Sequence, residues 1–171
     1  CHKDERGRIM NKEKIFETFI SQNLNNACRF AYIYVNSQQA AEDIVSESVV
    51  KALKSIHQLK DEKFLKTWFF KIIINTAYTY LKRSQKIVYM DDETLEKSFE
   101  KYNDSMEENS RVYFENIIKN LRPDYKSIIV LRFFENMKIH EISNILGLNE
   151  NTIKTRLYRA LKILKLEMEE G

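Results

Sequence analysis

Residues 138–162, KIHEISNILGLNENTIKTRLYRALK, carry the strongest structural signal in the chain. Apolar residues recur at helical spacing on both sides of Gly147, which supplies the left-handed backbone that ends many helices. Asn149 follows as a candidate N-cap. The stretch predicts a short helix over 139–146, a turn, and a second helix from 150 to about 166, which is the pattern of a helix-turn-helix.

The second of these helices is basic and polar on the side that its apolar residues leave free. A DNA-recognition helix places its N-terminal residues on base edges and nearby Lys and Arg side chains on phosphates. An ordinary amphipathic hairpin is the plainer interpretation, and the clustered cations favour DNA binding over it. The candidate residues are Asn151, Thr152, Lys154, Thr155, Arg156, Arg159 and Lys162.

The composition of the 171 residues predicts an all-α protein. With 3 Gly and 1 Pro, the chain lacks the paired glycines of phosphate-binding loops and the dipeptides of tight hairpins. Hydrophobic residues make up 43%, enough for a core, while the longest apolar stretches fall short of the ~20 residues that cross a bilayer. Two cysteines without CxxC spacing indicate a reduced, cytoplasmic setting.

No group of residues predicts a catalytic centre. The three histidines are scattered without metal-ligand spacing, and no paired carboxylates or nucleophile–base set are evident. We therefore expect a binding protein rather than an enzyme, with no metal, no cofactor and no small-molecule substrate.

Charge divides the chain into blocks. Residues 10–88 carry 12 basic and 7 acidic side chains, residues 89–110 carry 2 and 8, and residues 111–171 carry 11 and 8. The acidic segment has few regularly spaced apolar residues, which predicts a linker between two small helical domains. It is either a solvated spacer or a segment suited to a channel built for nucleic acid. Its 22 residues span at most ~79 Å when extended.

Three amphipathic helices account for the first block. Apolar residues recur every three or four residues over 15–34, over 41–56 and over 62–83. Ser37 is a plausible N-cap for the second helix. We expect residues 1–9, which precede Met10, to be a disordered native or added leader.

The second predicted helix carries an acidic face formed by Glu42, Asp43 and Glu47. Asp43 and Glu47 are a like-charge pair at i,i+4, which costs a few tenths of a kcal/mol. The face is either solvated and partly balanced by Lys51, or it docks a basic partner.

The third predicted helix interleaves cations with aromatic rings. This mixture suits single-stranded nucleic acid, because rings stack on bases while lysines follow phosphates. The rings equally suit a helical core, as we expect of Trp68. The residues concerned are Lys66, Trp68, Phe70, Lys71, Tyr78, Lys82 and Arg83.

Taken in order, these motifs resemble those of the extracytoplasmic-function (ECF) group of alternative sigma factors of bacterial RNA polymerase. The resemblance covers about residues 11–168. It rests on Ala40–Glu47 (AAEDIVSE), on Phe64–Phe69 (FLKTWF) with Ile72 and Asn75, and on Leu121–Phe134 followed by the helix-turn-helix.

The resemblance implies a role for each motif. Glu42, Asp43 and Glu47 would bind core RNA polymerase, and the second helix of the helix-turn-helix would contact the −35 promoter element. A cognate anti-sigma factor, which could hold the chain at the membrane, is implied as well. The implied −35 residues are Asn151, Thr152, Lys154, Thr155, Arg156 and Arg159.

Residues 59–83 would hold the melted −10 strand, with Asn75 near a flipped base. Thr79 stands where many family members carry an acidic residue. The implied −10 residues are Lys66, Trp68, Phe70, Lys71, Asn75, Tyr78, Lys82 and Arg83.

The expected organisation is a leader (1–9), a polymerase-binding and −10 domain (10–88), an acidic linker (89–110) and a −35 domain (111–171). The main alternative is a stand-alone helix-turn-helix repressor whose N-terminal helices bind a ligand or dimerise. A repressor would bind palindromic duplex without polymerase, whereas a sigma factor acts with the core enzyme.

Overall fold

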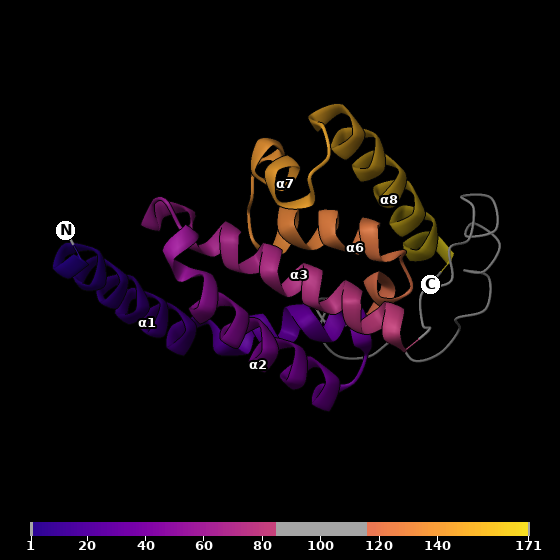
Figure 1. The fold of residues 1–171 in the computed structure, drawn as a ribbon. Helices are drawn as coiled ribbons and strands as arrows, with labels where there is room; N and C mark the ends of the chain where they lie inside the picture. The colour runs from indigo at the N-terminus through magenta and orange to yellow at the C-terminus, as the bar shows by residue number, and fades with distance from the viewer. Residues whose placement is uncertain (1, 85–115, 171) are drawn as a thin grey trace. The chain divides into compact units, whose positions relative to one another are not determined.

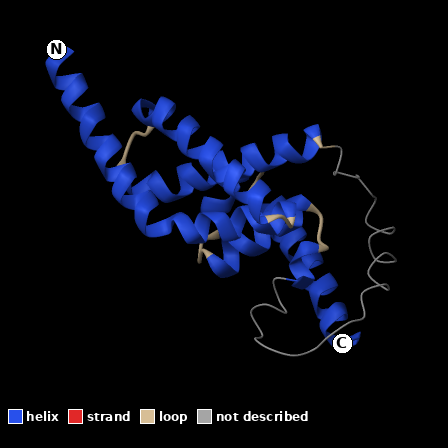
Figure 2. Ribbon diagram, turned by 90° about the horizontal axis from the view of Figure 1, so that it is seen from below, coloured by secondary structure: helices blue, strands red, loops and turns tan. Residues whose placement is uncertain are grey.

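The computed structural model describes residues 2–84 and 116–170 (Figure 1). Every regular element within these two ranges is helical (Figure 2), as the composition predicts. Contacts divide the chain into two compact units, Cys1–Tyr80 and Leu81–Gly171. The predicted linker 89–110 and both of its boundaries lie outside the described residues, so the predicted division into domains stays a prediction.

The first unit is built from three long helices and two short 3₁₀ turns. The three helices predicted over 15–34, 41–56 and 62–83 are confirmed, and α1 packs along α2. The elements are α1 (His2–Val35), α2 (Gln38–Ser55), η1 (Ile56–Gln58), η2 (Glu62–Phe64) and α3 (Leu65–Arg83).

Aromatic rings on α1 and α3 hold these two helices together. Phe16 and Phe69 meet edge to face with ring centroids 5.2 Å apart, and Phe30 and Phe70 do so at 4.8 Å. Such pairs contribute about 0.5–1.5 kcal/mol each beyond their buried area. All four rings are almost completely buried. The contact between α1 and α3 is therefore an aromatic seam.

The α1 helix begins earlier than the apolar pattern indicates. It includes His2–Ile9, so the expectation of a disordered leader over 1–9 is wrong for these residues. Asp4 and Glu5 lie in the first turn, where a negative charge interacts favourably with the helix dipole.

Ser37 starts α2 as predicted. Its side chain accepts a hydrogen bond from the amide of Ala40 at 3.3 Å. The preceding Asn36 has a φ of 50°, a left-handed conformation that Asn tolerates better than most residues. These two residues reverse the chain between α1 and α2.

The second unit contains the predicted helix-turn-helix. Pro123 occupies the first turn of its leading helix, as expected, and that helix continues without a break into a short π-helical segment. The α6 and α7 helices both pack against α8. The elements are α6 (Pro123–Ile129), η4 (Val130–Phe134), α7 (Ile139–Leu146) and α8 (Glu150–Glu170).

The turn between α7 and α8 is fixed by its own hydrogen bonds. Gly147 has a φ of 67°, and the amides of Gly147 and Leu148 both donate to the Ser143 carbonyl, at 2.9 and 3.3 Å. The Ser143 hydroxyl donates to the Leu148 carbonyl. Asn149 then caps α8 by accepting from the Thr152 amide at 2.8 Å. Gly147 thus ends α7 and Asn149 caps α8, as the sequence predicts.

We predict that Gly147→Ala destabilises the second unit by about 1–2 kcal/mol, because alanine resists a positive φ. A Cβ at this position would meet no heavy atom within 4 Å, so backbone strain alone is tested. The measurement is hydrogen exchange of the α7 and α8 amides. Gly147→Asn should cost less than alanine.

Gly7→Ala is the matched control, since Gly7 lies inside α1 and an added Cβ there also meets nothing within 4 Å. This change should leave α7 and α8 unaffected and stabilise α1 by about 0.5–1 kcal/mol. Equal protection of α7 and α8 in the Gly147→Ala variant and the parent would contradict the prediction.

Candidate nucleic-acid and protein interfaces

The acidic face lies on the exposed side of α2. Glu42, Asp43 and Glu47 are all exposed. Glu42 accepts a hydrogen bond from Gln38 at 3.1 Å, and Glu47 forms an ion pair with Lys51 at 3.0 Å. Asp43 forms no ion pair with any residue of 2–84 or 116–170 that the structure describes. The three carboxylates are therefore available to solvent or to a partner.

Two apolar side chains share this face. Val50 is 50% exposed and Leu53 is 37% exposed. Leu53 belongs to the apolar pattern that predicts a helix over 41–56, yet its side chain is exposed, so that pattern does not mark the buried side at this position. Leu53 and Val50 follow Ser46, itself exposed, at helical spacings that place all three on one side. The face is thus mixed, with apolar side chains among carboxylates.

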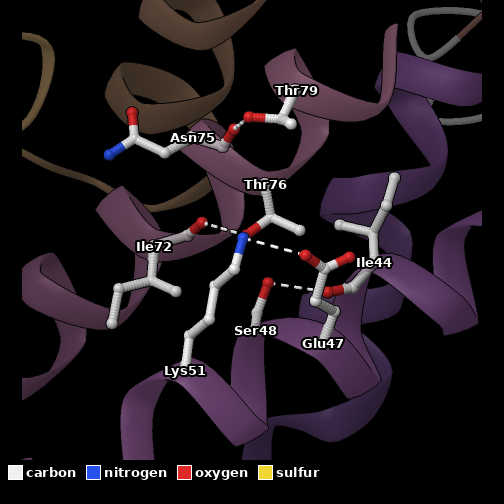
Figure 3. Close-up of polar contacts among 8 residues, drawn as sticks. All are labelled: Ile44, Glu47, Ser48, Lys51, Ile72, Asn75, Thr76 and Thr79. Atoms are coloured by element: carbon white, nitrogen blue, oxygen red, sulfur yellow. Dashed lines mark hydrogen bonds and ion pairs between the residues drawn. The ribbon is translucent and has the colours of Figure 1, made fainter. Parts of the chain in front are cut away.

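Lys51 links the acidic face to the neighbouring helix α3. Its Nζ atom lies 3.0 Å from Glu47 Oε1 and donates to Thr76 Oγ1 at 3.2 Å. Thr76 is buried and donates in turn to the Ile72 carbonyl at 2.8 Å. Figure 3 shows Thr76 pointing toward Lys51, whereas Asn75 points away from it. Sequence alone did not reveal this bridge, because it depends on how α2 and α3 pack.

The α3 helix brings four of the predicted −10 residues to one side. Lys71, Asn75, Tyr78 and Lys82 are separated by four, three and four residues, so their side chains share a face. Lys71, Asn75 and Lys82 are exposed, and Tyr78 is half-buried against Tyr34 with ring centroids 5.9 Å apart. Cations, an amide and a ring edge therefore lie in one row.

Other predicted −10 residues lie elsewhere. Phe70 is only 2% exposed with its ring against Phe30, so it has no free face for a base, and we correct its assignment. Trp68 is half-buried beside Phe16, as expected of a core ring. Lys66 is partly exposed on a different side of α3, and Arg83 is exposed in its last turn.

The α8 helix presents the predicted −35 residues unequally. Asn151, Lys154, Thr155 and Arg159 are exposed, whereas Thr152 and Arg156 are partly buried. The residues that follow the capped turn at helical spacing form an exposed row that we call the α8 row. It consists of Asn151, Lys154, Thr155, Tyr158, Arg159 and Lys162.

Tyr158 is the member of this row that the charge pattern missed. It is 74% exposed, although tyrosine is an amphipathic residue that usually hides part of its ring. Its spacing of three from Thr155 and four from Lys154 was the signal that could have identified it. Arg156, by contrast, forms an ion pair with Asp124 of α6 at 3.3 Å.

Among residues 2–84 and 116–170, no group of three or more His, Cys, Asp or Glu side chains could hold a metal ion. No helix within the same ranges has the length and apolar character of a membrane span.

The fold and these surfaces define an all-helical protein with a helix-turn-helix, and comparison with known proteins narrows this class. Residues 19–87 match the model of Sigma-70 region 2, and residues 111–164 match that of Sigma-70 region 4. The chain is 40% identical to RNA polymerase sigma factor SigV of Bacillus subtilis over 88% of its length and 89% of that protein. It is 27% identical to the ECF RNA polymerase sigma-E factor of Haemophilus influenzae over 92% and 89%.

A solved structure shares the fold. Sigma factor RpoE from Bartonella quintana, crystallised with the anti-sigma factor NepR, matches with a TM-score of 0.69 at 21% identity, over 90% of this chain and 96% of that one. The chain belongs to the RNA polymerase sigma factors, in the ECF group. As a sigma factor it binds the core enzyme and directs promoter-specific transcription initiation.

We predict that the Lys51–Thr76 hydrogen bond couples α2 to α3. Lys51→Met and Thr76→Val should each lower the free energy of unfolding by about 0.5–1.5 kcal/mol, because each removes one partner of the bond. Hydrogen exchange of the α2 and α3 amides is the measurement. The double variant should lose less than the two single losses combined.

Lys54→Met is the control for removing a lysine from α2, since Lys54 is exposed one turn away and forms no hydrogen bond or ion pair to α3 within residues 2–84. Additive losses for Lys51→Met and Thr76→Val would show that the bridge does not couple the helices.

Proposed function

We propose that the acidic face of α2 is the surface of this sigma factor that binds core RNA polymerase. Glu42, Asp43 and Glu47 supply negative charge, and Val50 and Leu53 supply apolar area among them. Protein interfaces commonly bury apolar side chains at the centre and keep charges at the rim. The matching surface of the polymerase would be a basic helix with apolar residues.

We further propose that the α3 row of Lys71, Asn75, Tyr78 and Lys82 contacts the melted −10 strand. Lysines spaced along one side of a helix can follow successive phosphates, and an exposed amide can hydrogen-bond to a base edge. Phe70 is left out because it is buried. Lys66, Trp68 and Arg83 are secondary candidates, since they lie away from the row.

The α8 row is proposed to contact the −35 duplex. A major groove about 12 Å wide admits one helix, whose first turns meet the base edges. In this proposal Asn151 and Thr155 contact bases, and Lys154 and Arg159 contact phosphates. The observation that carries the proposal is this exposed polar row directly after a capped, hydrogen-bonded turn.

An anti-sigma protein is proposed as the regulatory partner. The solved relative from Bartonella quintana was crystallised with one, and its fold matches this chain. We propose that the chain acts in the cytoplasm, where its polymerase and promoters are, and that it is inactive while the anti-sigma protein covers it. It contributes binding and no catalytic residue.

Runoff transcription with core polymerase and fragmented genomic DNA tests the function. The chain should produce discrete transcripts whose mapped start sites share −10 and −35 elements. Lys154→Glu should abolish or reduce them at least about tenfold, because a carboxylate in the α8 row repels phosphates. Lys165→Glu makes the same charge change on α8 one turn beyond Lys162, the last member of the row, and should transcribe like the parent.

No transcripts from the parent chain, together with tight binding to a palindromic duplex without polymerase, would favour a stand-alone repressor. Equal loss in the Lys154→Glu and Lys165→Glu variants would remove the α8 row from the −35 contact.

We predict that Asp43→Lys weakens binding to core polymerase about tenfold or more, since it places a cation on a surface expected to meet cations. Asp43 makes no ion pair with the described residues, so no internal bond is lost. The measurement is the dissociation constant from core polymerase. Glu17→Lys, an exposed change of equal charge on α1, is the control. Equal dissociation constants for the two variants would contradict the assignment of α2.

A further inference from the structure

A cluster of three charged residues joins the recognition helix to α6. Asp124, in the first turn of α6, accepts from Arg122 Nε at 3.1 Å and from Arg122 Nη2 at 3.1 Å. Arg156 Nη1 of α8 lies 3.3 Å from the same carboxylate. One carboxylate thus serves two guanidinium groups, one local and one from the helix that follows the turn.

The three side chains are more buried than an ordinary surface ion pair. The side chains of Arg122, Asp124 and Arg156 are 25%, 23% and 31% exposed. Arg122 also stacks over the Tyr125 ring, with its guanidinium carbon 5.2 Å from the ring centroid. The cluster is therefore packed as well as paired, and removing one member leaves the others partly desolvated.

Arg156 lies at the edge of the exposed row, three residues before Arg159, and is partly buried. Helical geometry turns each residue by about 100°, so Arg156 lies about 100° from Thr155 and on the flank that leads to buried Ile153. Arg159 and Lys154, three positions after and two before it, are exposed. Arg156 is thus the partly buried cation at the edge of the row, whereas Lys154, Arg159 and Lys162 are exposed.

Asp124 lies beside α8, the helix that is proposed to approach DNA phosphates, so its negative charge must be balanced. Asp124 alone would repel the DNA backbone, and its two arginines leave the cluster with a net positive charge. If Arg156 turned to the DNA, Asp124 would keep only Arg122, and α8 would lose a bond to α6.

We propose that Arg156 is a positioning residue that anchors α8 to α6 through Asp124 and sets the orientation of the α8 row, rather than a residue that contacts DNA. This role of Arg156 rests on the proposed function, in which the α8 row contacts the −35 duplex. The anchor itself is a property of the second unit and can be measured without DNA.

The first test is a double-mutant cycle on the full chain. Arg156→Met and Asp124→Asn should each accelerate hydrogen exchange of the α8 amides about tenfold, because each breaks a charge-assisted bond. The double variant should exchange no faster than about either single variant. Accelerations that multiply in the double variant would overturn the anchor.

The second test measures salt dependence with a mixed-sequence DNA duplex, and uses Arg159→Met as the matched control. A lost phosphate contact lowers the slope of log affinity against log salt by about one. Arg159→Met should show that decrease. Arg156→Met should keep the parental slope, with an affinity loss that is the same at every salt concentration.

Hydrogen exchange and salt dependence together show which proposal fails, the positioning role of Arg156 or the DNA surface on α8. A slope lowered equally by Arg156→Met and Arg159→Met overturns the positioning role. A parental slope for Arg159→Met instead overturns the proposed DNA surface, while the double-mutant cycle still decides whether Arg156 anchors α8.

Discussion

Each long helix within residues 2–84 and 116–170 buries one side against a neighbour, and the burial determines which side chains remain for partners. On α3, the seam with α1 takes Phe69 and Phe70 into the core. What stays outside is the row containing Lys71 and Asn75. Because side chains three and four apart share a side of a helix, the choice of the buried side fixes the exposed one. Function in this chain is therefore assigned by packing as much as by residue type.

The charged residues near these surfaces differ in how readily a partner could recruit them. Glu47 and Lys51 are 50% and 45% exposed, and an ion pair of that kind contributes about 0–1 kcal/mol. A basic partner could take over Glu47 at small cost. Asp124 is 23% exposed and holds two arginines, so releasing Arg156 would leave a partly desolvated carboxylate. The ion pair on α2 can therefore be exchanged for a pair with a partner, whereas the ion pair between α6 and α8 is retained within the protein.

Local signals in the sequence predicted the helices and the turn, whereas contacts between residues far apart in the chain could not be predicted from it. Ser37, Gly147 and Asn149 act within a few residues of themselves, and the structure confirms all three. The ring of Phe70 could be assigned only once α1 lay beside α3. Lys126 makes the same point: it is 6% exposed, and burial, with a smaller contribution from Lys119, lowers its pKa to about 8. No pattern in the sequence predicts that Lys126 is buried.

The α8 row begins between two fixed points. At its start, the Asn149 cap and the Ser143 hydrogen bond to Leu148 hold the turn. About two turns later, Arg156 ties the helix to Asp124. Residues between these restraints, Asn151 to Thr155, cannot tilt with the helix end, so less orientational freedom is lost when they meet a partner. The side chains of the α8 row all depend on the position of one helix, so a misplaced helix would misplace every contact at once. Holding the helix in place before binding therefore favours all of these contacts together.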